Sequence, residues 1–209
     1  MPMPAERYRS VLLYGAPGVG KGTQGRILGT IPGFFHLSSG DVFRSIDVRS
    51  PDGKEVSAFM SRGELVPDDL TIRLWRRALD ARIATTEYKP HEDLLILDGI
   101  PRSVGQSQLL QGHIEALGVI HLVSTDEPKM IERIRRRAIR ENRADDANES
   151  VIRRRFEIYR QQTAPVIDFY DPGLIAEVDA LGSPAEVLRD VLECVIPIQN
   201  RIFYGNGRQ

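Results

Sequence analysis

Cysteine is almost absent from this sequence, with Cys194 the only one among 209 residues. One thiol can form neither an internal disulfide nor a cysteine-rich zinc cluster, so disulfide scaffolds and that class of zinc protein are excluded. Long apolar runs are also missing, and residues 1–14 lack the apolar core of a signal peptide. We therefore expect a protein of a reducing compartment, the cytoplasm, with no membrane partner.

Net charge is nearly absent as well, since 28 lysines and arginines face 29 aspartates and glutamates, a net charge of −1. This balance disfavours a globally basic nucleic-acid binder, so we expect no nucleic-acid partner. Lysine is scarce: there are 4 lysines against 24 arginines, and ten of the arginines lie within residues 133–160. Arginine is the planar, bidentate partner of phosphate and carboxylate, although a codon bias would produce the same excess.

Apolar, strand-like runs alternate with helical segments along the chain. The predicted strands are residues 10–14, 34–37, 94–97, 119–123 and 174–178. The predicted helices are residues 21–28, 69–83 and 106–117, one that starts near Pro128 after the cap Asp126, and one after the capping box of residues 183–186. We expect the chain after Pro197 to be irregular. The alternation predicts an α/β fold with a mostly parallel sheet, in which ligands bind beyond the carboxyl ends of the strands.

Residues 15–23, GAPGVGKGT, follow the first predicted strand and open a helix. Their spacing is that of a phosphate-binding P-loop: the glycines let backbone N–H groups point inward around phosphate oxygens, and Lys21 supplies a charge for the β- and γ-phosphates. A glycine-rich turn that binds nothing is the alternative, but the lysine and the strand–helix context disfavour it. One position departs from the common pattern, because Gly22 replaces the usual serine or threonine and Thr23 comes one residue later.

The displaced hydroxyl affects how Mg²⁺ would bind. We expect the ion to be held mostly through phosphates and waters, with Thr23, Asp41 and Asp98 as the protein groups nearest to it. Asp98 directly follows one predicted strand, and Asp41 comes after the short turn that follows another. For Asp41, an ordinary helix cap is the alternative interpretation.

Six segments together resemble the nucleoside monophosphate kinases, and most closely the short-lid adenylate kinases. They are GAPGVGKGTQ (15–24), HLSSGDVFR (36–44), GELVPDDL (63–70), LDGIPRSVGQ (97–106), RADDANES (143–150) and TAPVIDFY (163–170). The resemblance implies one domain, residues 1–209, built on a P-loop-type five-stranded parallel sheet with helices on both faces. It divides the chain into a core (8–37, 67–137 and 149–196), a monophosphate-binding lobe (38–66), a short lid (138–148) and a C-terminal tail (197–209).

The family resemblance also implies an activity, the reversible transfer of the terminal phosphoryl group of ATP to AMP. The products are two ADP, the cofactor is Mg²⁺, and the enzyme is expected to be a monomer serving adenine nucleotide homeostasis. A UMP/CMP kinase and a GTP:AMP phosphotransferase remain alternatives, because the sequence does not fix the two bases. No general base is needed, since the attacking group is already an anionic phosphate. We accordingly expect only strand-edge or surface positions for the histidines, His36, His91, His113 and His121.

The resemblance assigns residues to each substrate. The implied ATP site comprises Gly18, Val19, Gly20, Lys21, Gly22, Thr23, Arg133, Arg137 and Gly182. The implied AMP site comprises Ser39, Arg44, Glu64, Leu65, Val66, Gly99, Ile100, Pro101, Arg102, Gln106, Arg143 and Arg155. The catalytic charges implied at the transferring phosphoryl group are Lys21, Arg102, Arg137, Arg143 and Arg155.

Two of these assignments concern the lid and the helix after it. Arg143 would clamp the transferring phosphoryl group, and Arg155 would approach it from the helix, with Arg154 as the alternative match. Asp145 and Asp146 are expected to hold lid arginines in the closed state, or else to cap the helix that follows them.

Gln106 is the predicted reader of the acceptor base, because it lies four residues after Arg102 on the same side of a helix. Its amide can donate a hydrogen bond to N1 of adenine and accept one from the N6 amine. Cytosine offers the same pair, and a flipped amide would suit guanine or uracil. Size and the resemblance favour adenine, since UMP/CMP kinases usually carry asparagine here. The resemblance places Ser39, where the family usually has threonine, near the monophosphate base. Ile100 stands where the family usually has an aromatic residue; this change would loosen the packing under the base but removes no charge.

Overall fold

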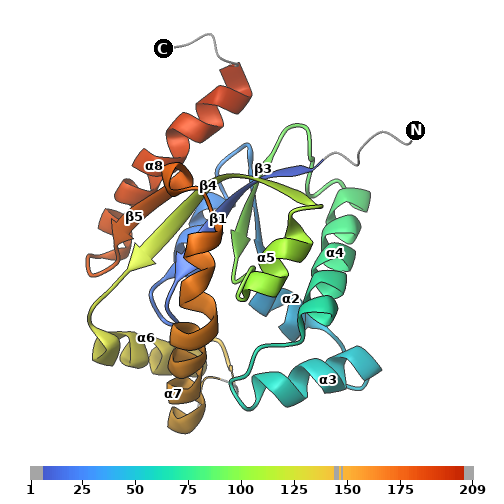
Figure 1. Ribbon diagram of the computed structural model, residues 1–209, viewed down its shortest axis with the longest axis vertical. Coiled ribbons are helices and arrows are strands. Elements are labelled where there is room, and N and C mark those ends of the chain that lie inside the picture. Colours follow the sequence, from blue (N-terminus) through green and yellow to red (C-terminus); the bar gives the residue numbers. More distant parts are fainter. Residues whose placement is uncertain (1–6, 144–145, 147, 205–209) are drawn as a thin grey trace.

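The computed structural model describes residues 7–143, 146 and 148–204 of the chain. Its strands form one parallel sheet in the order β2-β3-β1-β4-β5 (Figure 1). The strands are β1 (Tyr8–Gly15), β2 (Phe34–Ser38), β3 (Leu94–Asp98), β4 (Ile114–Val123) and β5 (Ile175–Asp179). The parallel α/β fold expected from the alternating pattern is confirmed.

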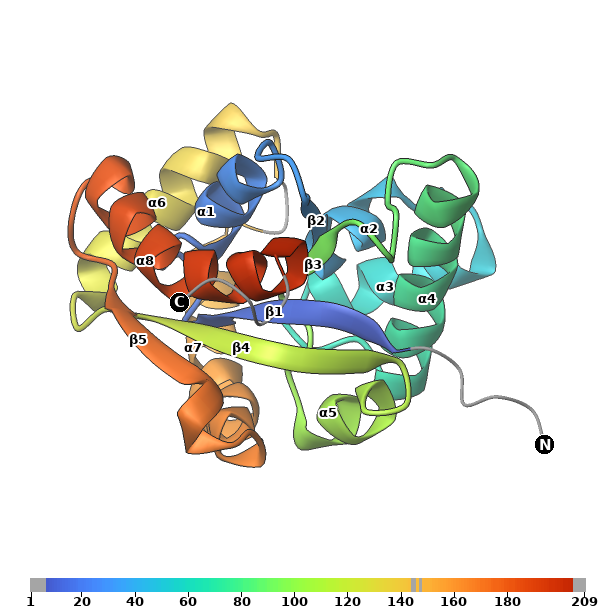
Figure 2. The same cartoon turned by 90° about the horizontal axis from the view of Figure 1, so that it is seen from above.

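Helices connect the strands and cover both faces of the sheet (Figure 2). They are α1 (Lys21–Leu28), α2 (Ser39–Ser45), α3 (Pro51–Met60), α4 (Asp68–Ala84), α5 (Val104–Leu110), α6 (Glu127–Arg140), α7 (Glu149–Ile158) and α8 (Pro184–Tyr204). A π-helical turn, Tyr159–Thr163, continues α7 and is followed by the 3₁₀ turns Ala164–Phe169 and Pro172–Leu174. None of the helices in the described part of the chain combines the length and apolar character needed to cross a membrane.

Strand β1 shows how the sheet separates two hydrophobic cores. Val11 and Leu13 belong to the core that contains Leu28 of α1 and the buried side of α8. Leu12 points to the opposite face, where Trp75 of α4 and Leu110 of α5 are completely buried. Successive side chains of a strand point to opposite faces, so an unbroken apolar run is what a strand covered on both sides requires. These two cores hold the sheet in place and thereby position the loops at its carboxyl edge.

A small separate core forms the base of the α2–α3 segment. Val56 of α3 packs with Val66, Leu70 and Leu74, the last two from α4. Residues 56–66 thus rest on α4 through their own apolar cluster, whereas Val42 of α2 packs against the second core of the sheet. The lobe at residues 38–66 and its movement stay predictions.

Helix caps account for several of the boundaries that the sequence predicted. The Asp126 side chain accepts a hydrogen bond from the backbone N–H of Lys129 at 2.9 Å, which starts α6. Ser183 and Glu186 form the predicted capping box, with reciprocal hydrogen bonds of 2.7 and 3.3 Å. Each cap satisfies backbone donors that the first helical turn leaves unpaired.

Two predictions are wrong. The predicted helix 106–117 ends at Leu110, because β4 begins at Ile114 and pairs with β1 from Tyr8 onward. Sheet pairing overrides the helical pattern there.

The segment after Pro197 is helical through Tyr204 rather than irregular. Ile198 is buried in the core and the Gln199 side chain donates to the Pro32 carbonyl at 2.9 Å, so packing maintains the helix past its proline. Residues 205–209 of the predicted tail lie outside the described residues.

Candidate functional site

The loop between β1 and α1 is built to leave backbone N–H groups open. Gly15, Gly18 and Gly20 have φ angles of 137°, 78° and 118°, a region that side chains beyond glycine rarely adopt. Gly20 is also the N-cap of α1, and no side chain caps that helix end. An uncapped helix N-terminus at the end of a glycine-rich loop is an anion-binding site.

Lys21 lies folded over this loop. Its Nζ donates hydrogen bonds to the carbonyl oxygens of Gly15 at 2.6 Å and Ala16 at 3.0 Å. Burial lowers the pKa of Lys21 to about 7; Asp98 opposes that effect, whereas Arg102 and other nearby arginines add to it. Burial thus destabilises the ammonium group, and an anion in the loop would stabilise it.

Asp98 explains why Gly22 replaces the usual hydroxyl residue. Asp98 ends β3 and is nearly buried, and a Cβ atom at Gly22 would lie 3.3 Å from its Oδ2 atom. Burial raises the pKa of Asp98, but His36 and the charges of Lys21 and Arg102 outweigh burial, so this pKa is lowered overall. The glycine therefore leaves room for an ionised carboxylate beside the P-loop.

The strand position of His36 was predicted from the sequence, but the burial of its side chain was not. It lies on the edge strand β2, as expected, but only 9% of its side chain is exposed, and its Nε2 atom lies 3.8 Å from Oδ2 of Asp98. The ring fills the space beside Gly25 of α1. His121 is also mostly covered, at 18% side-chain exposure, so the expectation of surface positions was wrong for its side chain. No local pattern signals either packing, because the partners come from other strands and helices.

A first pocket opens around the P-loop. All the residues predicted for the triphosphate line it, as do the three candidates for Mg²⁺: Gly18, Val19, Gly20, Lys21, Gly22, Thr23, Arg133, Arg137, Gly182, Asp41 and Asp98. Arg136 and Arg140 line it too, although the sequence had not singled them out. Helix α6 explains their presence, since its arginines recur at helical spacing beside the loop.

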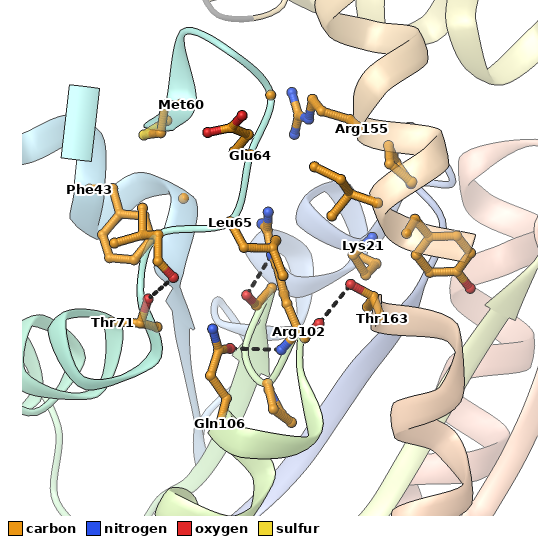
Figure 3. A pocket seen from close by; sticks show the side chains of 18 of the residues that line it. Lys21, Phe43, Met60, Glu64, Leu65, Thr71, Arg102, Gln106, Arg155 and Thr163 are labelled. Atoms are coloured by element: carbon orange, nitrogen blue, oxygen red, sulfur yellow. Dashed lines mark hydrogen bonds between the residues drawn. The ribbon is translucent and has the colours of Figure 1, made fainter. Parts of the chain in front are cut away.

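A second pocket opens between the α2–α3 segment and the loop after β3 (Figure 3). The predicted residues that line it are Arg44, Glu64, Leu65, Val66, Gly99, Pro101, Arg102, Gln106 and Arg155. Ser39 and Ile100 are buried and do not line it, and Arg143 lines the first pocket instead. Phe43, Met60, Thr71, Tyr159 and Thr163 also line it, which the sequence did not predict.

Hydrogen bonds fix the loop that forms the floor of the second pocket. The Arg102 N–H donates to Oε1 of Gln106 at 2.7 Å, and Nε of Arg102 donates to the Gly99 carbonyl at 2.8 Å. The Ser39 hydroxyl donates to the same carbonyl at 2.7 Å. Figure 3 shows Gln106 and Arg102 side by side on this floor. Ser39 therefore supports the loop from below.

The two pockets share part of their lining. The shared residues are Pro17, Lys21, Gly40, Arg44, Arg102 and Arg155. Four of the six are cationic, and burial together with the charge of Arg155 lowers the pKa of Arg102 to about 10. Like charges gathered in a partly buried place favour an anion there. The junction is thus the strongest candidate position for phosphate groups.

Asp146 joins two of the expected arginines. Its side chain is fully buried and accepts hydrogen bonds from Nε of Arg137 at 3.1 Å and from Arg155. The prediction was that Asp146 holds lid arginines in the closed state; the partners found, Arg137 and Arg155, lie outside the predicted lid (138–148), so that role stays a prediction. Asp145 lies outside the described residues. Arg154, the alternative to Arg155, pairs with Glu157 at 3.0 Å on the exposed side of α7.

Arg143 and Asp41 connect the lid segment to the α2–α3 segment. Nη2 of Arg143 lies 3.3 Å from Oδ1 of Asp41 and 2.6 Å from Oε2 of Glu141. Asp41 also accepts a hydrogen bond from Arg44 at 2.7 Å, whereas the cap of α2 is Ser38. Among the described residues, no group of three aspartates, glutamates, histidines or cysteines could hold a metal ion.

Comparison with known proteins agrees with this geometry. A sequence model of the family described as adenylate kinase matches residues 13–173. The chain is 40% identical over 185 residues to the adenylate kinase of Thermus thermophilus, covering 86% of this chain and 92% of that protein. It is 43% identical over 179 residues to the adenylate kinase of Synechococcus sp., covering 83% and 91%, and 40% identical over 184 residues to that of Thermobifida fusca, covering 85% and 93%.

Proposed function

The chain belongs to the adenylate kinase family, and we propose that its two pockets hold ATP and AMP with their phosphates facing each other. It is a phosphotransferase that moves the terminal phosphoryl group of ATP to AMP, giving two ADP. The observation that carries the proposal is the shared lining of the pockets. Lys21, Arg44, Arg102 and Arg155 line both, so phosphates entering from either side would meet at these cations.

ATP occupies the first pocket in this proposal. The N–H groups at the uncapped start of α1 cradle its phosphates, and Lys21 leaves the loop carbonyls to reach them. Arg133 covers the adenine, and Gly182 lies beside it on the same pocket wall.

AMP occupies the second pocket. Arg44 and Arg102 bind its phosphate, and the backbone of Glu64 to Val66 lines the space for the nucleoside. Gln106 faces that space with its Oε1 atom already hydrogen-bonded to the Arg102 N–H. This bond supports an amide orientation in which the NH₂ group is available to N1 of adenine.

Positioning and charge supply the catalysis. The phosphate of AMP is already the nucleophile, so the chain needs no proton-accepting side chain. Lys21, Arg102, Arg137, Arg143 and Arg155 offset the negative charge that spreads over the transferring group, and they stabilise the transition state more than the ground state. Asp146 keeps Arg137 and Arg155 aimed at the junction.

Mg²⁺ is the expected cofactor, and the donors near the P-loop fit it. Thr23, Asp41 and Asp98 offer hard oxygen ligands in one pocket. They do not make a protein cage, which agrees with an ion bound through waters and the ATP phosphates. When bound, Mg²⁺ would neutralise phosphate charge. Asp98, ionised beside Lys21, would hold its water shell.

We also propose that the protein works as a monomer in the cytoplasm and serves adenine nucleotide homeostasis. The single cysteine fits a reducing compartment.

A substrate panel tests the function. Each nucleoside triphosphate is paired with each monophosphate in the presence of Mg²⁺, and nucleoside diphosphate formation is measured. The proposal predicts the largest kcat/KM for ATP with AMP. A preference for UMP, CMP or GMP would contradict the adenylate assignment, and hydrolysis of ATP without an acceptor would contradict phosphoryl transfer between nucleotides.

A further inference from the structure

The backbone of Arg102 is held on both sides of its Cα atom. Its N–H donates to Oε1 of Gln106 at 2.7 Å, and its carbonyl accepts a hydrogen bond from Oγ1 of Thr163 at 2.8 Å. Gln106 belongs to the helix that begins just after the loop, whereas Thr163 lies 61 residues away in sequence. Thr163 therefore ties the floor of the acceptor pocket to a different part of the fold.

Thr163 comes from the same continuous helix as Arg155. Helix α7 runs into the π-helical turn Tyr159–Thr163, in which Ala164 donates its N–H to the carbonyl of Tyr159, five residues earlier. Such π-helical turns are rare in proteins, and those that do occur are frequently found at functional sites. Thr163 is 8% exposed and, like Arg155, lines the second pocket; Figure 3 shows both on the pocket side of the helix.

The bond opposes a repulsion between two arginines. Arg102 and Arg155 line the same junction, and the charge of Arg155 contributes to lowering the pKa of Arg102. Asp146 pairs with Arg155 and offsets part of this repulsion, but the two like charges still disfavour a close approach. A hydrogen bond from the Arg155 helix to the Arg102 backbone keeps the two elements together.

We propose that Thr163 is a positioning residue for the acceptor phosphate. Its hydroxyl holds the Arg102 loop against the helix that carries Arg155, so that both arginines face one phosphate group. The inference rests on the assignment of AMP to the second pocket. Thr163 does not touch the reacting atoms; it acts through the backbone of Arg102.

Two substitutions separate the hydroxyl from the rest of the side chain. Thr163→Val keeps the shape and removes the hydrogen bond, and Thr163→Ser keeps the hydroxyl and removes a methyl group. We expect Thr163→Val to raise KM for AMP about tenfold while KM for ATP stays within about twofold of the wild type. Thr163→Ser should stay within about twofold for both nucleotides.

Steady-state kinetics with either nucleotide varied measure the split, and thermal unfolding checks each variant. An unchanged KM for AMP in folded Thr163→Val would overturn the inference. So would an equal loss for both nucleotides, or a defect in Thr163→Ser as large as that of the valine variant. Thr163→Ala gives the same test if the valine variant does not fold. A selective rise of KM for ATP would instead contradict the assignment of the two pockets.

Discussion

Lys21 combines two properties that rarely occur in one lysine, a place among open N–H groups and a pKa of about 7 caused mainly by burial. Its present partners are the carbonyls of Gly15 and Ala16, which are neutral acceptors. A phosphate would be a stronger partner and would raise this pKa again. The charge of Lys21 should therefore depend on nucleotide binding.

Proton uptake on ATP binding is the first prediction. At about pH 8, free Lys21 is mostly neutral and bound Lys21 is charged, so binding should take up close to one proton and weaken as pH rises. Calorimetry in buffers of different ionisation enthalpy measures the uptake, with Lys21→Met as the control that lacks it. Equal uptake in Lys21→Met would refute the assignment to this residue.

The lowered pKa of Lys21 also affects stability. The unfolded chain binds this proton more tightly than the folded protein does, so the free energy of unfolding should rise from about pH 7 to 10.

Gln106 carries the second prediction, which concerns base selectivity. Gln106→Ala removes an amide from a buried position, where an unpaired group costs about 1–3 kcal/mol. We expect KM for AMP to rise and the advantage of AMP over CMP and UMP to fall by roughly tenfold. Because the amide also holds the Arg102 N–H, KM for every monophosphate should rise somewhat. If selectivity stays intact while all values of KM rise equally, Gln106 supports the loop without reading the base.

Among the elements, α1 and β2 pack closely because Gly25 of α1 and its C-cap Gly29 lie against His36 of β2. A Cβ atom at Gly25 would lie 2.3 Å from Nε2 of His36, and one at Gly29 would lie 2.8 Å from its Cβ atom. The ring is mostly buried, with Asp98 on its other side.

The third prediction follows from this contact. Gly25→Ala should destabilise the protein by about 1–3 kcal/mol, although alanine is the better helix former. Gly112→Ala is the matched control, because no atom lies within 4 Å of a Cβ at that position, and it should change stability by less than about 0.5 kcal/mol. Urea unfolding measures both. Equal stability of the two variants would show that the His36 ring yields easily.

The strands and helices also show which features could be predicted from the sequence alone. The strands around the P-loop and the caps at Asp126 and Ser183 were predictable, because their signals are local. The extent of β4 was not, since pairing with β1 decides it. Among site residues, the glycines and arginines of the motifs were identifiable. Thr163 and His36 were not, because their partners lie 61 and 62 positions away in the chain.

On the scale of the whole molecule, the α2–α3 segment and the lid segment approach each other across the first pocket. Arg143 and Asp41 join them at 3.3 Å, an exposed contact that contributes little by itself. The α2–α3 segment has a small core of its own against α4. We expect both segments to close over bound nucleotides and exclude water.

The fourth prediction tests this closure. A ligand that joins adenosine to adenosine through a chain of phosphates should slow amide exchange in α2, α3 and the end of α6. AMP alone should protect only α2 and α3, which makes it the internal control. Tight binding of the joined ligand with no added protection in either segment would mean that they do not act as covers.

We infer that the two pockets form one continuous cleft, in which the phosphates of both nucleotides meet at Lys21, Arg102 and Arg155. Titration calorimetry with the same joined ligand tests this inference, with ATP and AMP added as competitors in separate experiments. We expect one ligand per chain, displaced by either nucleotide. Two ligands per chain, or displacement by only one of the nucleotides, would overturn the inference.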